Sequence, residues 1–122
     1  PAERLIVTAL DARRGLIYCS SYKYKTGCLS RRSGYLLLSL DEFLKKFSAA
    51  KPIVLGDAIS LYGDKILAGI KGAAFMDKDY WSLQPCNLME LAVIKIKSRQ
   101  FTSALKVKPI YLYPKECQIK AK

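Results

Sequence analysis

The first forty residues alternate between apolar runs and short polar stretches, a pattern typical of strands. Residues 5–10 are apolar and rich in strand-forming residues, and residues 16–25 place alternate side chains on two faces. The polar stretch 11–15 between them ends in a glycine and predicts a tight turn, so the two runs are expected to pair as an antiparallel hairpin. A third antiparallel strand is expected at 35–38, after a mobile loop over 27–34.

A helix is expected to begin at Ser39, because Ser39 and Glu42 have the S-x-x-E spacing of a capping box. Its apolar positions recur at helical spacing and predict one buried face. They are Leu40, Phe43, Leu44 and Phe47. The pair at 51–52, Lys-Pro, ends the helix. The short apolar run 53–55 then predicts a buried, central, parallel strand.

The second half of the chain continues the alternation of helices and strands. Residues 59–70 predict a helix, and residues 73–76 predict a short strand. A longer helix over 86–99, opened by Pro85, is almost continuously apolar and is expected to be well buried. The prolines and aromatic residues of 107–114 predict an extended segment.

The order of these elements predicts an α/β fold. Three strands are followed by helix, strand, helix, strand and helix, which indicates a mixed sheet with an antiparallel three-strand edge and flanking helices. This is the order of one ribonuclease-H-like domain. A length of 122 residues also suits one core rather than two, so a single domain over residues 1–122 is expected.

The charge balance is strongly basic. Lys and Arg number 21 and Asp and Glu number 10, which gives a net charge of +11 and favours an anionic partner. Hydrophobic residues make up 51% of the chain, a share that excludes disordered and low-complexity classes. The chain has no histidine, so Ser-His-Asp triads, Cys-His pairs and histidine-bearing metal sites are excluded within it.

The four cysteines are widely separated and form no C-x-x-C pair, which argues against a zinc ribbon or a thioredoxin-like site. They are Cys19, Cys28, Cys86 and Cys117. Free thiols in a reducing compartment are therefore expected, and with them a cytoplasmic location. No apolar run approaches the ~20 residues of a membrane span, so no membrane partner is expected.

Four segments, in order along the chain, resemble motifs in the second domain of the TsaB family, also called YeaZ. Residues 10–22 resemble its "DAR…G-x-Y…Y" hairpin, and residues 55–57 resemble its strand-end "GDG/GDA". Residues 85–92 are similar to its "P-x-A-x-x-L-x-x-L-A" helix, and residues 108–113 to its terminal "P-x-Y-L-R". The departures are the two residues after the helix proline, where small residues are usual, and Tyr113, where arginine is common.

The resemblance implies a ribonuclease-H-like domain of the actin-like ATPase superfamily. The family acts in the synthesis of threonylcarbamoyladenosine, the modified adenosine next to the anticodon of tRNA. By this resemblance the chain is a non-catalytic scaffold or activating subunit that binds a TsaD-type catalytic subunit, with a TsaE-type ATPase completing the assembly. ATP is used by the complex, tRNA is reached through it, and no cofactor or metal is expected on this domain. The resemblance covers the carboxyl-terminal domain alone, so the amino-terminal domain is expected to be absent from this chain, and a homodimer through normally covered faces is expected.

Five residues at two turns are candidates for a surface that faces a partner or a cleft. They are Asp11, Arg13, Arg14, Gly56 and Asp57. Two arginines at a hairpin turn can reach a phosphate or a carboxylate, and α/β sheets place ligand sites at the carboxyl ends of parallel strands. Each feature also has a structural interpretation. Asp11 can bind turn amides beside solvated arginines, and Asp57 can cap the next helix.

Tyrosines and lysines interleave along residues 18–25, as they do on surfaces where nucleic-acid bases stack. They are Tyr18, Tyr22, Tyr24, Lys23 and Lys25. On a small sheet such tyrosines can equally pack under a helix. The basic tail offers further candidates for RNA contact, or simply a solvated terminus. Its lysines are Lys115, Lys120 and Lys122.

Two functions from other classes stay open beside the scaffold. A stand-alone basic RNA-binding module would account for the net charge and the tyrosines, and it requires strongly salt-dependent tRNA binding. An enzyme would use carboxylates such as Asp11 and Asp57 with a metal ion. Unchanged pathway activity after both are replaced by alanine would eliminate that enzyme.

Overall fold

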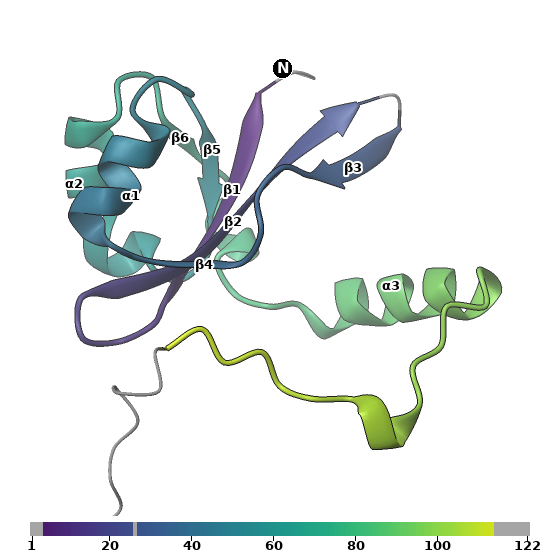
Figure 1. Ribbon diagram of the computed structural model, residues 1–122. Helices are drawn as coiled ribbons and strands as arrows, with labels where there is room; N and C mark the ends of the chain where they lie inside the picture. The colour runs from purple at the N-terminus through teal and green to yellow at the C-terminus, as the bar shows by residue number, and fades with distance from the viewer. Residues whose placement is uncertain (1–3, 26, 114–122) are drawn as a thin grey trace, which may run out of the picture. The chain divides into compact units, whose positions relative to one another are not determined.

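The computed structural model describes residues 4–25 and 27–113 (Figure 1). The chain divides after Ser82 into two compact units, the first of which contains the sheet and the second the longest helix. The expectation of one domain over residues 1–122 stays a prediction.

The hairpin predicted at the start of the chain is confirmed. β1 (Leu5–Asp11) pairs antiparallel with β2 (Leu16–Lys25) along the whole of β1. The turn between them contains three successive residues with positive φ: Arg13 at 64°, Arg14 at 54° and Gly15 at 75°. Only the glycine adopts this left-handed backbone without a steric cost, so the two arginines are held there by the closure of the hairpin.

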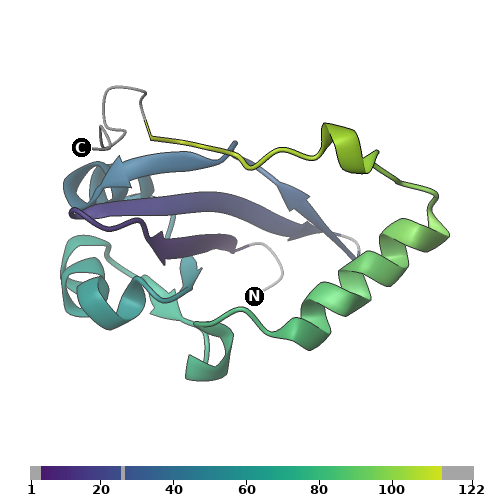
Figure 2. The same ribbon diagram turned by 90° about the horizontal axis from the view of Figure 1, so that it is seen from below.

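The expectation of a loop over 27–34 is wrong for its first half, where β3 (Cys28–Arg31) pairs antiparallel with the end of β2. β4 (Leu36–Ser39) is the expected third strand, and it pairs with the start of β2. Figure 2 shows β2 between β1 and β4. β2 is 10 residues long, so one of its edges has room for both partners. The antiparallel part of the sheet therefore has one strand more than predicted.

Two short parallel strands complete the sheet. β5 (Ile53–Leu55) pairs parallel with β1 on one side and with β6 (Ala74–Phe75) on the other. The sheet order is β3-β2-β1-β5-β6, with β4 also on β2. The predicted mixed sheet and the interior, parallel position of β5 are confirmed.

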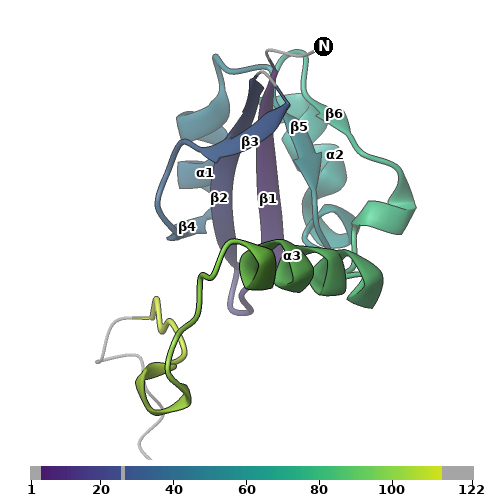
Figure 3. The ribbon, with the colours of Figure 1, turned by 90° about the vertical axis from the view of Figure 1, so that its right-hand side faces the viewer.

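Both helices of the first unit cover the same face of the sheet (Figures 1 and 3). α1 (Leu40–Phe47) ends four residues before the predicted Lys-Pro end, and α2 (Ile59–Gly69) has nearly its predicted bounds. The core lies between these helices and the sheet. Its fully buried side chains include Val7, Ala9, Ile17, Phe43, Val54, Ile66 and Ile70.

The predicted capping box at the start of α1 is confirmed. The N–H of Glu42 donates to Oγ of Ser39 (3.3 Å), and the N–H of Ser39 donates to Oε2 of Glu42 (2.8 Å). These bonds satisfy two amides that the first turn of a helix otherwise leaves unpaired. The bond from the backbone of Ser39, and then that from its hydroxyl, lower the pKa of the Glu42 carboxyl below its ordinary value.

We expect Ser39→Ala to lower the free energy of unfolding by about 1 kcal/mol at neutral pH, because one amide of α1 loses its acceptor. The Glu42 contribution has its own pH dependence. Its pKa is lower in the folded state, so the stabilisation is complete above the unfolded pKa and is lost as the pH falls through the folded pKa. In urea unfolding, the difference in the free energy of unfolding between the wild type and Glu42→Ala should therefore shrink in acid. A difference that stays constant or grows as the pH falls would contradict the capping box.

The second unit is built around α3 (Pro85–Lys97), which begins with its proline in the first turn as predicted. A single 3-10 turn, Ala104–Lys106, and irregular chain up to residue 113 follow it. No residue of α3 is buried, so the expected burial is wrong within its own unit. Between residues 83 and 113 the structure has no second α-helix and no strand that could cover the apolar side chains. In the part of the chain described, no helix has both the length and the apolar character needed to cross a bilayer.

Candidate functional site

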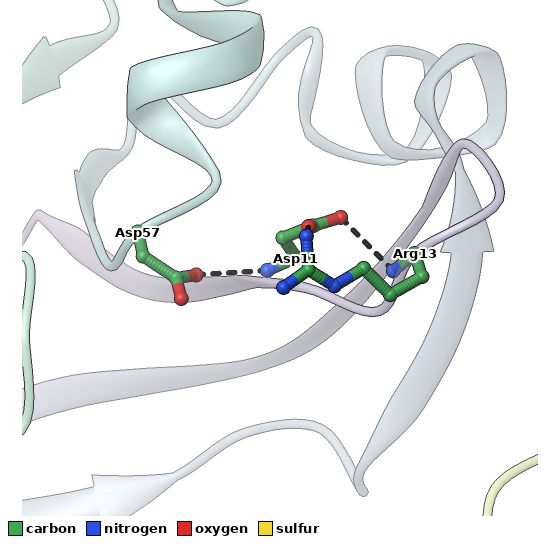
Figure 4. Close-up of polar contacts among 3 residues, drawn as sticks. All are labelled: Asp11, Arg13 and Asp57. Atoms are coloured by element: carbon green, nitrogen blue, oxygen red, sulfur yellow. Dashed lines mark hydrogen bonds and ion pairs between the residues drawn. The ribbon is translucent and has the colours of Figure 1, made fainter.

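Three of the five predicted site residues meet at the ends of β1 and β5 (Figure 4). The N–H of Asp11 donates to Oδ1 of Asp57 (2.8 Å), which ties the end of β1 to the residues after β5. The N–H of Arg13 donates to Oδ1 of Asp11 (2.9 Å), and Nη1 of Arg13 lies 3.2 Å from the other oxygen of the same carboxylate. These contacts form one connected polar network, Asp57 to Asp11 to Arg13.

The parallel pairing of β1 with β5 brings these residues together. Thr8 lies opposite Leu55, so the chain leaves both strands at the same edge of the sheet. Gly56 then turns back against β1 with a φ of 122°, and a Cβ at this position would overlap the carbonyl group of Ala9. That carbonyl accepts a hydrogen bond from the N–H of Ala58 (3.2 Å). Gly56 is thus a close-approach glycine.

The structural interpretation of Asp11 as a turn residue is confirmed, because its carboxylate accepts from the Arg13 amide within the same turn. Asp11 is 12% exposed at its side chain, whereas Arg13 is 87% exposed. The ion pair between them is therefore mostly in solvent and contributes little stability. Arg14 is also exposed. The turn presents two guanidinium groups at the surface, either of which can bind a phosphate or a carboxylate.

The interpretation of Asp57 as a helix cap is wrong. The N-cap of α2 is Ala58, and no side chain caps this helix. Asp57 is drawn away because its carboxylate accepts the amide of Asp11, 46 residues earlier in the chain. An amide at the end of a strand has no ladder partner, so the carboxylate satisfies a donor that the sheet leaves open.

The two carboxylates therefore have structural partners. Within the residues described, no three His, Cys, Asp or Glu side chains gather where they could hold a metal ion. What the site offers chemically is a polar edge of the sheet with basic side chains projecting from it.

The thiols are free where the structure describes them. Cys19, Cys28 and Cys86 form no disulfide, as expected from their spacing. Burial raises the pKa of the Cys19 thiol to about 11, against a smaller opposite effect of Lys46. This thiol is therefore protonated and unreactive at neutral pH. Cys117 and the three tail lysines, Lys115, Lys120 and Lys122, lie outside the described residues, and their expected roles stay predictions.

The tyrosines of β2 lie on the sheet face opposite the one that α1 and α2 cover, because they alternate with the buried Ile17 and Cys19. Tyr18 and Tyr22 are half-buried, and Tyr24 is 48% exposed, so packing under a helix is wrong for Tyr24. One neighbouring contact is not expected from the sequence: the guanidinium of Arg31 lies 4.7 Å from the ring centre of Tyr35. A loop over 27–34 gives no position for Arg31, whereas the pairing of β3 with β2 fixes it.

Comparison with known proteins returned solved structures only: no protein-family model matches the chain, and neither does any curated protein. One similar structure is described as that of an uncharacterized protein with similarity to peptidase YeaZ from Pseudomonas aeruginosa. It has 19% sequence identity and a TM-score of 0.65, and the match covers 91% of this chain and 50% of that one. The structure of YeaZ from Pseudomonas aeruginosa has 19% identity and a TM-score of 0.63, and the match covers 89% of this chain and 50% of that one.

The chain has the fold of YeaZ. The resemblance drawn from four sequence motifs is thereby confirmed for the fold, over about 90% of this chain. The chain spans about half the length of each YeaZ-like structure it matches. The activities and partners of a whole YeaZ-type protein belong to the proposal below.

Proposed function

We propose that this chain is the second domain of a TsaB (YeaZ)-type protein, a non-catalytic scaffold or activating subunit. It would bind a TsaD-type catalytic subunit in the synthesis of threonylcarbamoyladenosine in tRNA, with a TsaE-type ATPase as the further partner. The observation that carries this proposal is the YeaZ fold over about 90% of the chain, together with four YeaZ-like motifs in the same order.

The topology supports the finer assignment of a ribonuclease-H-like domain. An antiparallel hairpin leads into the sheet, β1 lies in its middle, and β5 and β6 extend it in parallel on the far side. The two helices that connect the parallel part lie on one face, as right-handed crossovers in the same direction require.

The site chemistry supports a partner role over a hydrolytic one. Asp11 and Asp57, the carboxylates that an enzyme would use, accept hydrogen bonds from backbone amides and hold two strand ends together. The exposed Arg13 and Arg14 are better suited to contact an acidic surface of a partner. Under this proposal the domain itself holds no cofactor, and ATP is consumed elsewhere in the complex.

Size-exclusion chromatography of the 122-residue chain with the TsaD-type subunit from the same source tests the proposal. We expect the two to co-elute, and Arg14→Glu to weaken the complex because it reverses a charge at the proposed contact. Lys71→Glu is the matched control: Lys71 is also exposed but follows α2, at the opposite end of the parallel strands. Absence of any complex, or equal loss with both variants, would overturn the proposed contact.

A second readout separates the scaffold from an enzyme. In a reconstituted threonylcarbamoylation assay with the longer protein, Asp11→Asn and Asp57→Asn should retain activity, because the amide oxygen of asparagine still accepts the same hydrogen bonds. An activity that collapses while both variants stay folded would assign the carboxylates a catalytic role and contradict the scaffold.

A further inference from the structure

The end of β2 and the whole of β3 form a two-stranded segment, residues 22–25 and 28–31, which we call the arm. Its strands pair with Tyr22 opposite Arg31 and Tyr24 opposite Leu29, so these four side chains share one face. β3 pairs with β2 alone among the described strands, and all four of its residues are exposed. Figure 1 shows the arm on the side of the sheet away from α1 and α2.

The arm lies in a stretch of sequence whose charged residues are all basic. Residues 12–40 contain six Lys or Arg and no Asp or Glu. Four of these cations belong to the arm or follow it directly, and all four are exposed. They are Lys23, Lys25, Arg31 and Arg32. Among the described residues none of the four has a carboxylate within ion-pair distance, so their charge is not neutralised by the fold.

The aromatic rings share their face of the arm with Arg31, whereas Lys23 and Lys25 lie on the other face of the same strand. Tyr24 is 48% exposed, and Tyr35, at 49%, carries the guanidinium of Arg31 over its ring. Tyr22 and Tyr24 are two residues apart on one strand face, which separates them by about 7 Å. A phenol ring that is half exposed on a cationic strand offers a flat apolar surface together with charge beside it.

We propose that the arm binds single-stranded RNA, with unpaired bases stacking on Tyr24 and Tyr35 and a phosphate contacting Arg31 on the same face. Lys23 and Lys25, on the other face of the arm, add long-range attraction for the RNA backbone. An acidic protein surface would use the charge but has no need of the exposed rings. A duplex would offer phosphates but keeps its bases stacked inside. The proposal does not depend on the scaffold function, because it rests on the arm alone.

Fluorescence anisotropy of the full chain with a fluorescein-labelled oligouridine of about twelve nucleotides tests the proposal. We expect Tyr24→Ala to weaken binding about tenfold, and Tyr24→Phe to bind as the wild type does, because stacking needs the ring and not the hydroxyl. The matched control is Tyr80→Ala. Tyr80 has the same 48% exposure but follows Asp77 and Asp79, outside the arm. Its replacement should leave binding unchanged.

The charge contribution has its own control. Arg31→Ala should lower the slope of log affinity against log salt by about 1, because one phosphate contact is lost on the face that carries the rings. Lys45→Ala, on α1 near Asp41 and Glu42, should leave the slope unchanged.

Two results would overturn the proposal. One is an equal loss with Tyr24→Ala and Tyr80→Ala. The other is binding of an RNA duplex or polyglutamate as tight as that of oligouridine, which would show that charge acts without the rings. The scaffold proposal is tested independently, because Tyr24→Ala should leave the complex with the TsaD-type subunit intact.

Discussion

Replacing Gly56 by alanine is expected to lower the free energy of unfolding of the first unit by about 4 kcal/mol. Two costs combine. The added Cβ would overlap the carbonyl group of Ala9, and relieving such overpacking costs about 1–3 kcal/mol. A φ of 122° is also outside the range of L-residues other than glycine, at a further cost of about 1–3 kcal/mol.

Two other glycines separate these costs. Gly15 has a φ of 75°, but an added Cβ would meet open space. Gly15→Ala should therefore lower the free energy of unfolding only by the backbone cost, about 1 kcal/mol. Gly34 has open space and no positive φ, so Gly34→Ala should cause no loss. Urea unfolding can be followed by the fluorescence of Trp81, the one tryptophan of the chain, which packs edge-on against Phe75 beside the core. Equal stability of Gly56→Ala and Gly34→Ala would contradict the close approach of β1 to the β5 end.

The Gly56 result also bears on function. Gly56 belongs to the segment that resembles a family motif, and the structure explains it by local contacts alone. It lets the N–H of Ala58 reach the carbonyl oxygen of Ala9, and it places Asp57 against Asp11. A fold-destabilised Gly56→Ala would also lose any partner contact made at this edge. The Arg14→Glu variant is therefore the informative one for partner binding.

The second large effect is expected from Phe43→Ala, with a loss of about 3–5 kcal/mol. Phe43 is fully buried between α1 and the sheet, and its ring meets that of Phe47 edge to face at 4.9 Å. Truncation leaves a cavity that the surrounding strands can fill only by shifting. The cost therefore includes lost packing as well as lost transfer free energy.

Phe101→Ala makes the same substitution at a ring that is 72% exposed, and it serves as the matched control. Its effect on the Trp81 transition should stay within about 0.5 kcal/mol. If the midpoints of the urea transition shift by similar amounts in both variants, the packing of Phe43 does not stabilise the core. A change in the slope of the urea transition for Phe43→Ala alone would indicate a looser, partly collapsed state.

Much of the first unit could be predicted from the sequence because its signals are local. The alternation in 16–25 and the glycine at position 15 are enough to predict the hairpin. The S-x-x-E spacing and the apolar stripe behind it are enough to predict α1 and the side it buries. The buried, parallel β5 follows from an unalternated apolar run. In each case the residues that carry the signal are neighbours in the chain.

The candidate site could be predicted only in part. Asp11, Arg13 and Asp57 were singled out from the sequence, and the structure joins them in one network. The cap considered for Asp57 is wrong, because a cap is the local use of such a residue and its actual partner, the amide of Asp11, lies in another strand. Its place on a surface that faces a partner stays a prediction. Arg14 was placed correctly in the turn but takes no part in that network in the described contacts.

The sequence by itself determined the elements whose hydrogen bonds close within a few residues, together with their order and the basic character of the chain. Tertiary structure alone decided features that depend on distant segments. Gly56 is required because β1 passes beside it. Arg4 ties three parts of the chain together, donating to the carbonyl oxygens of Lys51 (3.0 Å) and Gly72 (2.7 Å). The physical reason is the same throughout: a donor or an acceptor 46 to 68 residues away has no local trace in composition or periodicity.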